Sequence, residues 1–312
     1  MRRQSLQKLA QTSSPIAFNH IHPRHPRLPI ALNTCLSVRQ SQFVRPYPSA
    51  RPALREYTST SILRRDRPFT ADDVNMDSYS LPTDKMRKLR DPSRTPLVLI
   101  SCGSFSPITY LHLRMFEMCV DWVRENTEYE VVGGYLSPVS DAYKKQGLAP
   151  AYHRLEMCRL AALESNWIMV DPWEASKKEY TRTAVVLDHM QYEINEARGG
   201  VETSTGERRP AKIALLSGAD LIQTMSEPGV WSQQDLDHIL GRYGGFIIER
   251  SGTDMEKALE SLSRWRNNIY PIPQLVQNDV SSTKVRNFLR KDMSIRYHSS
   301  SVLSGIHADW FS

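Results

Sequence analysis

The chain has 312 residues, of which 40% are hydrophobic, and it carries a formal net charge of +6. This length suits one large domain or two small ones, and no segment approaches the roughly 18–20 apolar residues of a membrane span. The positive charge lies in residues 1–75, which hold 12 Lys and Arg against 4 Asp and Glu and leave 28 against 30 for the rest. We therefore expect neither nucleic acid nor a membrane as a partner of the folded body.

Residues 1–75 are expected to be a basic, disordered extension. Residues 1–55 contain nine Lys and Arg but no Asp or Glu, and an Arg-rich, Ser-rich and acid-free start is typical of a mitochondrial transit peptide. The alternative is an unprocessed extension, or a start at Met76 or Met86, which would leave the protein in the nucleus or cytoplasm. The histidines at 20, 22 and 25 lie in a Pro-rich segment without partners to orient them, so we expect no metal site.

Residues 76–96 are expected to be a lead-in and residues 97–297 the folded domain, in which strand-like and helix-like segments alternate. Apolar runs predict strands at 97–100, 129–136, 167–170, 212–216, 245–248 and 268–272. Helical spacing predicts helices at 113–123, 152–164, 184–194, 232–240 and 254–265, with a loop at 196–210. Serial alternation indicates an α/β fold with a doubly wound parallel sheet. The last strand should be an edge because Pro271 cannot donate to a ladder.

A turn of small residues, 101–112, joins the first strand to the first helix. Gly103 and Ser104 leave room for a ligand to approach the backbone. Pro107 precedes the helix, where the N–H group that proline lacks would have no helical partner. His112 falls in the first helical turn and can donate to a phosphate oxygen held at the positive helix end. The alternative is an ordinary strand–turn–helix connection. The turn matches neither the Walker loop nor the dinucleotide-binding fingerprint.

Other polar groups follow strands and should gather at the same sheet edge, where ligands of such sheets bind. A second hydroxyl-rich helix start has Ser281 or Ser282 as its N-cap and Arg286 one turn in, which together could hold a polyphosphate. The remaining groups are Gly218 and Asp220 for a ribose, the loop lysines 144 and 145, and the rings of Trp173 and Tyr180 for a planar base or pyridine. Each has an ordinary alternative: a capped helix, solvated lysines, or a core tryptophan.

The loop at 103–112 resembles the Gly-x-Phe-x-Pro-x-His/Thr-x-x-His motif of the nucleotidylyltransferase superfamily, and 280–286 is similar to its Ile-Ser-Ser-Thr-x-x-Arg partner. Segments 137–145, 150–154, 218–221 and 228–231 resemble the eukaryotic, fungal-like nicotinamide/nicotinate mononucleotide adenylyltransferases. The resemblance implies a Rossmann-like nucleotidylyltransferase fold. It also implies a reaction of NAD biosynthesis, in which the adenylyl group of ATP passes to either mononucleotide and pyrophosphate leaves.

The resemblance also implies roles for individual residues. His112 and Arg286 would be catalytic, by steadying charge on the ATP phosphates. The ATP site would comprise Gly103, Ser104, Phe105, His112, Gly218, Asp220, Ser282, Thr283 and Arg286. The mononucleotide site would comprise Ser104, Phe105, Lys145, Thr183 and Trp231. Mg²⁺ would arrive with ATP and need no protein cage, and a homo-oligomer is expected.

After Tyr297 the sequence departs from the family pattern, which continues Leu-x-Pro into an apolar helix. Residues 298–312 are therefore expected to be an atypical tail that lacks the closing helix and can weaken activity. Two other functions stay open at this stage. One is a different transferase of the superfamily, such as a pantetheine-phosphate adenylyltransferase or a cytidylyltransferase. The other is a nucleotide-binding or chaperone-like protein without catalysis.

Overall fold

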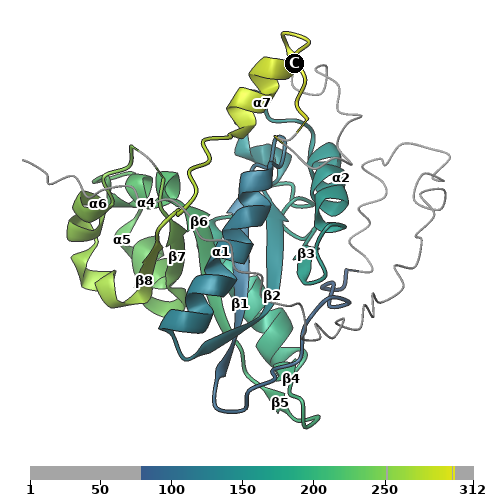
Figure 1. The fold of residues 1–312 in the computed structure, drawn as a ribbon, viewed down its shortest axis with the longest axis vertical. Coiled ribbons are helices and arrows are strands. Elements are labelled where there is room, and N and C mark those ends of the chain that lie inside the picture. The colour runs from purple at the N-terminus through teal and green to yellow at the C-terminus, as the bar shows by residue number, and fades with distance from the viewer. Residues whose placement is uncertain (1–78, 251, 297, 299–312) are drawn as a thin grey trace, which may run out of the picture. The chain divides into compact units, whose positions relative to one another are not determined.

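The structure is a computed structural model that describes residues 79–250, 252–296 and 298 (Figure 1). The expectations for the basic extension 1–75 and its histidines lie outside the described residues, as do those for the tail after residue 298. Among the described helices, none is long and apolar enough to cross a membrane.

Six parallel strands form one sheet in the order β3-β2-β1-β6-β7-β8. Their bounds are β1 Thr95–Gly103, β2 Tyr129–Pro138, β3 Ile168–Val170, β6 Lys212–Gly218, β7 Gly245–Ile248 and β8 Ile269–Ile272. The central strand β1 is buried on both faces, since Leu97, Val98, Leu99 and Ile100 are each 0% exposed. The strand order reverses between β1 and β6, so the doubly wound parallel fold is confirmed and its switch point lies there.

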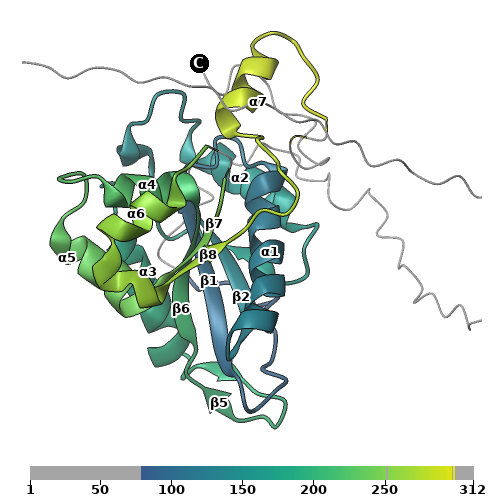
Figure 2. The same cartoon turned by 60° about the vertical axis from the view of Figure 1, so that its left-hand side comes forward.

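Helices cover both faces of the sheet (Figure 2). They are α1 Tyr110–Asn126, α2 Ala151–Ala162, α3 Thr183–Gln191, α4 Ala219–Ser226, α5 Gln233–Leu236, α6 Met255–Ser261 and α7 Ser282–Leu289. Alternate residues of β1 serve two cores: Leu97 and Leu99 pack with α1 and α2, whereas Val98 and Ile100 pack with α3 and the helices that follow β6. This is the two-sided burial expected for a parallel sheet.

The structure corrects several predicted elements. The predicted loop at 196–210 contains a small hairpin of β4 Val201–Glu202 and β5 Arg208–Arg209, whose strands are too short to show a periodicity. The predicted helices 184–194 and 232–240 pass into π-helical turns at Tyr192–Glu196 and Asp237–Tyr243. The helix predicted at 254–265 is shorter than expected: α6 ends at Ser261, and 3₁₀ turns follow over Ser263–Asn268. The prediction of an edge strand at Pro271 is confirmed, because β8 ends the sheet.

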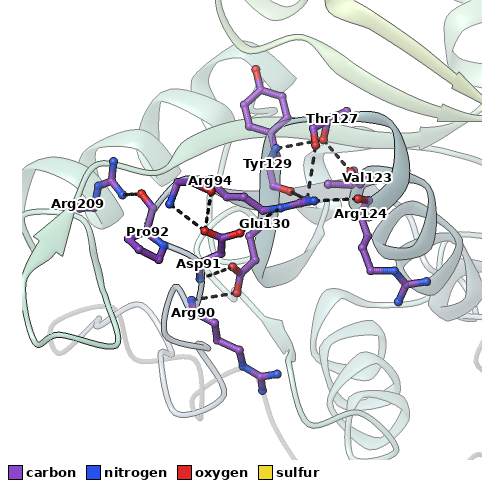
Figure 3. Close-up of polar contacts among 11 residues, drawn as sticks. Arg90, Asp91, Pro92, Arg94, Val123, Arg124, Thr127, Tyr129, Glu130 and Arg209 are labelled. Carbon is purple, nitrogen blue, oxygen red and sulfur yellow. Dashed lines mark hydrogen bonds and ion pairs between the residues drawn. The ribbon is translucent and has the colours of Figure 1, made fainter.

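The residues ahead of β1 pack onto the domain. Leu81 and Leu89 are 2% and 1% exposed, so this segment contributes to the core. Arg94 reaches the C-terminal end of α1, where its guanidinium donates to the carbonyls of Arg124 at 3.0 Å and Tyr129 at 2.9 Å (Figure 3). A cation at that end satisfies carbonyls that have no helical partner. The lead-in thus fixes the far end of the helix whose first turn carries His112.

Candidate nucleotide-binding site

A cavity of about 320 Å³ opens at the carboxyl ends of the central strands. Its walls come from the turns after β1, β6 and β7 and from the start of α7. Of the residues predicted from the sequence, it gathers Gly103, Ser104, Phe105, His112, Lys145, Gly218, Asp220, Ser282, Thr283 and Arg286. Segments separated by more than 100 residues therefore meet at one cavity, at the sheet edge where ligands of this fold bind.

The turn after β1 is shaped around Phe105, whose φ of +43° lies in the left-handed region. Its ring is 2% exposed and folds back over Gly103. A Cβ atom at Gly103 would stand 3.0 Å from the Cζ atom of that ring. Only glycine fits there without displacing Phe105, and the resulting bare backbone forms part of the cavity wall.

His112 is held in one tautomer. Its Nδ1 atom accepts from the backbone N–H of Thr109 at 3.0 Å, so the ring proton of the neutral imidazole sits on Nε2. The ring meets Phe105 edge to face at 5.2 Å between centroids. Burial lowers the pKa of His112 to about 4, because desolvation disfavours the charged form. His112 therefore presents a neutral Nε2–H donor in the first turn of α1.

The two helix-start motifs are bonded directly to each other. Ser281 is the N-cap of α7, since its hydroxyl accepts from the N–H of Lys284. Ser282 donates to the carbonyl of Pro107 at 2.7 Å, and Arg286 donates from Nη1 to the carbonyl of Ser106 at 2.6 Å. These bonds join residues 175 and 180 positions apart. The turn after β1 and the start of α7 therefore behave as one wall.

Two residues of the site have a buried polar atom without a hydrogen-bond partner among the described residues: Arg286 at Nε, and Ser217, which lies in β6, at Oγ. Both residues line the cavity. An unpaired buried donor costs roughly 1–3 kcal/mol, so native sites keep such groups where a ligand or water completes them. The chemistry of the wall, with hydroxyls, backbone N–H groups, an arginine and a neutral histidine, suits an anion with several oxygens.

Asp220 lies in the first turn of α4 and pairs with Arg250, Oδ2 to Nη1, at 2.8 Å. Arg250 also donates to the carbonyl of Asp279, just ahead of the α7 motif. It follows β7 and lines the cavity, yet the sequence reasoning did not single it out. Its place after a core strand is the signal that could have found it.

Arg154 is a second residue to which the sequence assigns no role, although it lies in the segment 150–154 that carries part of the resemblance. Its side chain is 0% exposed and donates to the carbonyl of Ser104 at 3.3 Å and to Oδ1 of Asp141 at 3.1 Å. It therefore ties the turn after β1 to the loop that carries Lys145. Nearby, Glu174 accepts from the hydroxyl of Ser137 at 2.6 Å, and burial raises the pKa of Glu174 to about 7.

Thr183 and Trp231 do not line the cavity that holds His112. Thr183 is the first residue of α3, and the loop ahead of it borders a cavity lined by Trp173, Lys177, Tyr180 and Arg182. Trp231 lines a third cavity among α4, α5 and α6, and its indole N–H donates to the hydroxyl of Thr224. The residues that the resemblance assigns to the pyridine thus stand apart from the wall formed by the turn after β1 and the start of α7.

Comparison with known proteins gives a consistent picture. Residues 100–288 match the family model described as cytidylyltransferase-like. The chain is 56% identical over 227 residues to nicotinamide/nicotinic acid mononucleotide adenylyltransferase 1 of Saccharomyces cerevisiae, covering 71% of this chain and 57% of that protein. It is 54% identical over 236 residues to the Schizosaccharomyces pombe enzyme of that name, covering 74% and 64%.

A bovine relative, nicotinamide/nicotinic acid mononucleotide adenylyltransferase 1 of Bos taurus, is 38% identical over 242 residues, covering 67% of this chain and 85% of that protein. The chain spans less than two thirds of the length of the two fungal relatives. The family match nevertheless runs from the end of β1 to α7 and so includes the segments that line the cavity. The chain belongs to the nicotinamide/nicotinic acid mononucleotide adenylyltransferase family, within the cytidylyltransferase-like group.

Proposed function

We propose that this protein transfers the adenylyl group of ATP to nicotinamide mononucleotide or nicotinate mononucleotide, giving NAD or its deamido form and pyrophosphate. One observation carries the proposal. The two helix starts that line the cavity form a single wall through the bonds of Ser282 and Arg286 to the turn after β1, and the buried Nε atom of Arg286 has no partner among the described residues. The family relatives that bear this activity in their names support the choice of substrates.

On the ATP side, the wall would hold the triphosphate. Ser282 and Thr283 lie at the start of α7, where free backbone N–H groups attract anions. Arg286 would add charge-assisted bonds, and Gly218 and Asp220 would meet the adenosine ribose from the end of β6. Arg250 would keep Asp220 oriented, because the two are already paired.

The reaction needs little covalent help from the protein. An oxygen of the mononucleotide 5′-phosphate would attack the α-phosphorus of ATP in line, forming the new P–O bond. The bond from that phosphorus to the α–β bridging oxygen breaks, and its electron pair leaves with pyrophosphate. Positioning and charge stabilisation would supply the rate enhancement. His112 would donate from Nε2 to an ATP phosphate oxygen, where charge develops in the transition state.

On the acceptor side, Gly103, Ser104 and Phe105 would line the mononucleotide with backbone groups. Lys145 borders the same cavity and would reach the mononucleotide phosphate. The pyridine ring would extend toward the cavity beside Thr183, whose wall includes Trp173 and Tyr180. Trp231 would approach the ring from the turn between α4 and α5. The extended ligand would therefore bridge the separate cavities that these residues line.

Mg²⁺ would be bound mainly by the triphosphate and water. In the described part of the chain, no group of three or more His, Cys, Asp or Glu side chains is placed to hold a metal ion. The carboxylate of Glu249 also borders the cavity and suits a hard cation. The ion would supply charge neutralisation between the phosphates, while the residues of the wall orient them.

The test is a panel of acceptors offered to the folded protein, with pyrophosphate release as the readout. Each mononucleotide is supplied with ATP. Pantetheine phosphate with ATP and a phosphorylated alcohol with CTP represent the other transferases of the superfamily. Pyrophosphate release that occurs only when a mononucleotide is supplied with ATP supports the proposal. Release only with another acceptor would reassign the reaction, and a folded protein that binds nucleotide without any release would be a non-catalytic member.

We further propose that the basic extension directs the protein to mitochondria and that the protein assembles as a homo-oligomer. The first proposal rests on the acid-free composition of residues 1–55. Fusion of residues 1–70 to a fluorescent reporter tests it, and a diffuse signal would contradict it. Light scattering on the purified protein tests the second, and a monomer mass would contradict it.

A further inference from the structure

A buried polar cluster lies behind Trp173 and outside the cavity that holds His112. Its members are Tyr79 from the lead-in, Asp171 directly after β3, and His189 on α3. The hydroxyl of Tyr79 donates to Oδ1 of Asp171 at 3.0 Å and lies 2.9 Å from Nε2 of His189. The same Nε2 atom is 3.3 Å from Oδ2 of Asp171. Asp171 is 0% exposed, so three separate segments are joined around one buried carboxylate.

The cluster fixes the orientation of Trp173. The backbone N–H of Trp173 donates to Oδ1 of Asp171 at 3.1 Å. Its indole stacks on the His189 ring with centroids 4.0 Å apart and planes only 6° from parallel. The Nζ atom of Lys177 also lies 4.0 Å from the indole centroid. His189 therefore covers one face of Trp173, and a pyridine ring cannot stack on that face.

Trp173 therefore lines the cavity ahead of α3 as a fixed side chain. It also begins a segment that is hydrogen-bonded to the loop after β2. Glu174 accepts from Ser137, and the hydroxyl of Ser140 donates to the carbonyl of Glu179. The rings of Tyr143 and Tyr180 stack at 5.7 Å. That loop also carries Lys145, which borders the phosphate cavity. The position of the segment 173–182 and the position of Lys145 are thus mechanically linked.

We propose that Tyr79, Asp171 and His189 are positioning residues for the acceptor mononucleotide: they hold Trp173, and through it they set the separation between the ring-binding cavity and the lysine that meets the mononucleotide phosphate. The inference rests on the proposed function. None of the three residues lines the cavity that holds His112. Substitutions that loosen these residues should therefore weaken binding of the mononucleotide and leave binding of ATP unaffected.

The main test is Tyr79→Phe, which keeps the ring and removes both hydroxyl contacts. The chain offers a matched control in Tyr243→Phe. The hydroxyl of Tyr243 donates to Asp188 at 2.6 Å, and the same carboxylate meets His238 at 2.8 Å, so this is a second Tyr–Asp–His cluster that does not contact Trp173. Melting temperature, kcat and the KM values for each substrate are measured for both variants.

Tyr79→Phe should raise the KM for nicotinamide mononucleotide about fivefold, the ratio equivalent to one ordinary hydrogen bond. The KM for ATP should change less than about twofold, and Tyr243→Phe should lower the melting temperature without this split. A second pair of variants separates stacking from polar contact. His189→Phe keeps a flat ring against Trp173, and His189→Ala does not, so the mononucleotide KM should rise more in His189→Ala.

Two results would overturn the inference. With an active wild-type protein, equal KM changes in Tyr79→Phe and Tyr243→Phe, or equal rises for both substrates, would show that the cluster acts only on stability. If the folded wild-type protein neither binds nor adenylylates a mononucleotide, the proposed function fails and the inference fails with it. Wild-type turnover measured in the same assay distinguishes these cases.

Discussion

Arg286 donates from Nη1 to the carbonyl oxygen of Ser106 at 2.6 Å, across 180 residues of sequence. The guanidinium is anchored at two nitrogens, because Nη2 also donates to the hydroxyl of Thr283 at 3.1 Å, and Nε is buried without a partner among the described residues. An arginine fixed in this way cannot turn to solvent when the site is empty. Under the proposed function it would meet a phosphate oxygen of ATP without first losing side-chain freedom, which is one source of affinity.

Arg286→Ala should raise the KM for ATP by about tenfold or more, as expected for a lost charge-assisted bond. The KM for the mononucleotide should rise less, because the wall held by Arg286 faces the triphosphate. Arg290→Ala, one turn further along the chain, is the matched control. A larger effect on the mononucleotide than on ATP would mean that the two subsites are interchanged.

His112→Ala should lower kcat by roughly a hundredfold or more, the usual loss for one donor aimed at developing charge. Circular dichroism should show the fold intact, because His112 is a half-buried residue in the first turn of a long helix. Turnover close to that of the wild type would contradict the assigned role.

The pH dependence gives a separate test of His112. Its pKa of about 4 keeps the imidazole neutral in the free enzyme from pH 8 down to pH 5.5. The profile of kcat/KM, which reports free-enzyme groups, should therefore contain no ionisation near pH 6.5 that vanishes in His112→Gln. Such an ionisation would show that the histidine is charged in the empty site.

Glu174 makes stability depend on pH in a direction opposite to that of most carboxylates. Burial raises its pKa to about 7 from an ordinary value of 4.5. The folded state therefore keeps a proton that the unfolded state loses, and stability falls as the pH rises from about 4.5 through 7. Glu174→Gln, which can still accept from Ser137, should remove this loss.

Chemical denaturation of the wild type and Glu174→Gln at pH 5 and pH 8 measures the effect. At pH 8 the free energy of unfolding of the variant should exceed that of the wild type by an amount on the order of 3 kcal/mol or less. An equal stability difference at both pH values would mean that Glu174 ionises normally in the folded protein.

Arg94→Ala should destabilise the fold while leaving the KM values unchanged. The guanidinium donates to the carbonyl of Arg124 in the last turn of α1 and to that of Tyr129 at the start of β2 (Figure 3), whereas His112 lies in the first turn of α1. The expected loss is about 1–3 kcal/mol, or about 2–4 °C in melting temperature for each kcal/mol. Arg90→Ala is the control, because the contact near Glu130 uses the backbone N–H of Arg90. Equal melting temperatures for the two variants would contradict the account.

The sequence predicted the six-stranded sheet well because each core strand is a contiguous apolar run next to an amphipathic helix. Gly103, His112, Ser282 and Arg286 were found for a similar reason, since each lies in a short motif with a clear physical reading. The hairpin at β4 and β5 was missed because two-residue strands carry no periodicity.

Residues whose roles depend on distant contacts were harder to find. Nothing local to Arg250 or Arg154 reveals that one pairs with Asp220 and the other with the Ser104 carbonyl. Thr183 and Trp231 were assigned by resemblance, and the structure puts them beside other cavities. Tyr79 lies in a segment that reads as a lead-in, yet it contacts a carboxylate 92 residues away. The positions and contacts of these residues depend on tertiary packing, which no short sequence motif encodes.

The central claim is that one wall, built from the first turn and the start of α7, binds the ATP from which an adenylyl group is transferred. The most direct measurement supplies ATP labelled with ¹⁸O at the α–β bridge, together with nicotinamide mononucleotide, to the wild type and to His112→Ala. The account predicts equal amounts of NAD and pyrophosphate from the wild type, all the label in pyrophosphate, and a roughly hundredfold slower reaction in the variant. A folded wild type that forms no dinucleotide, or label retained in the dinucleotide, would contradict it.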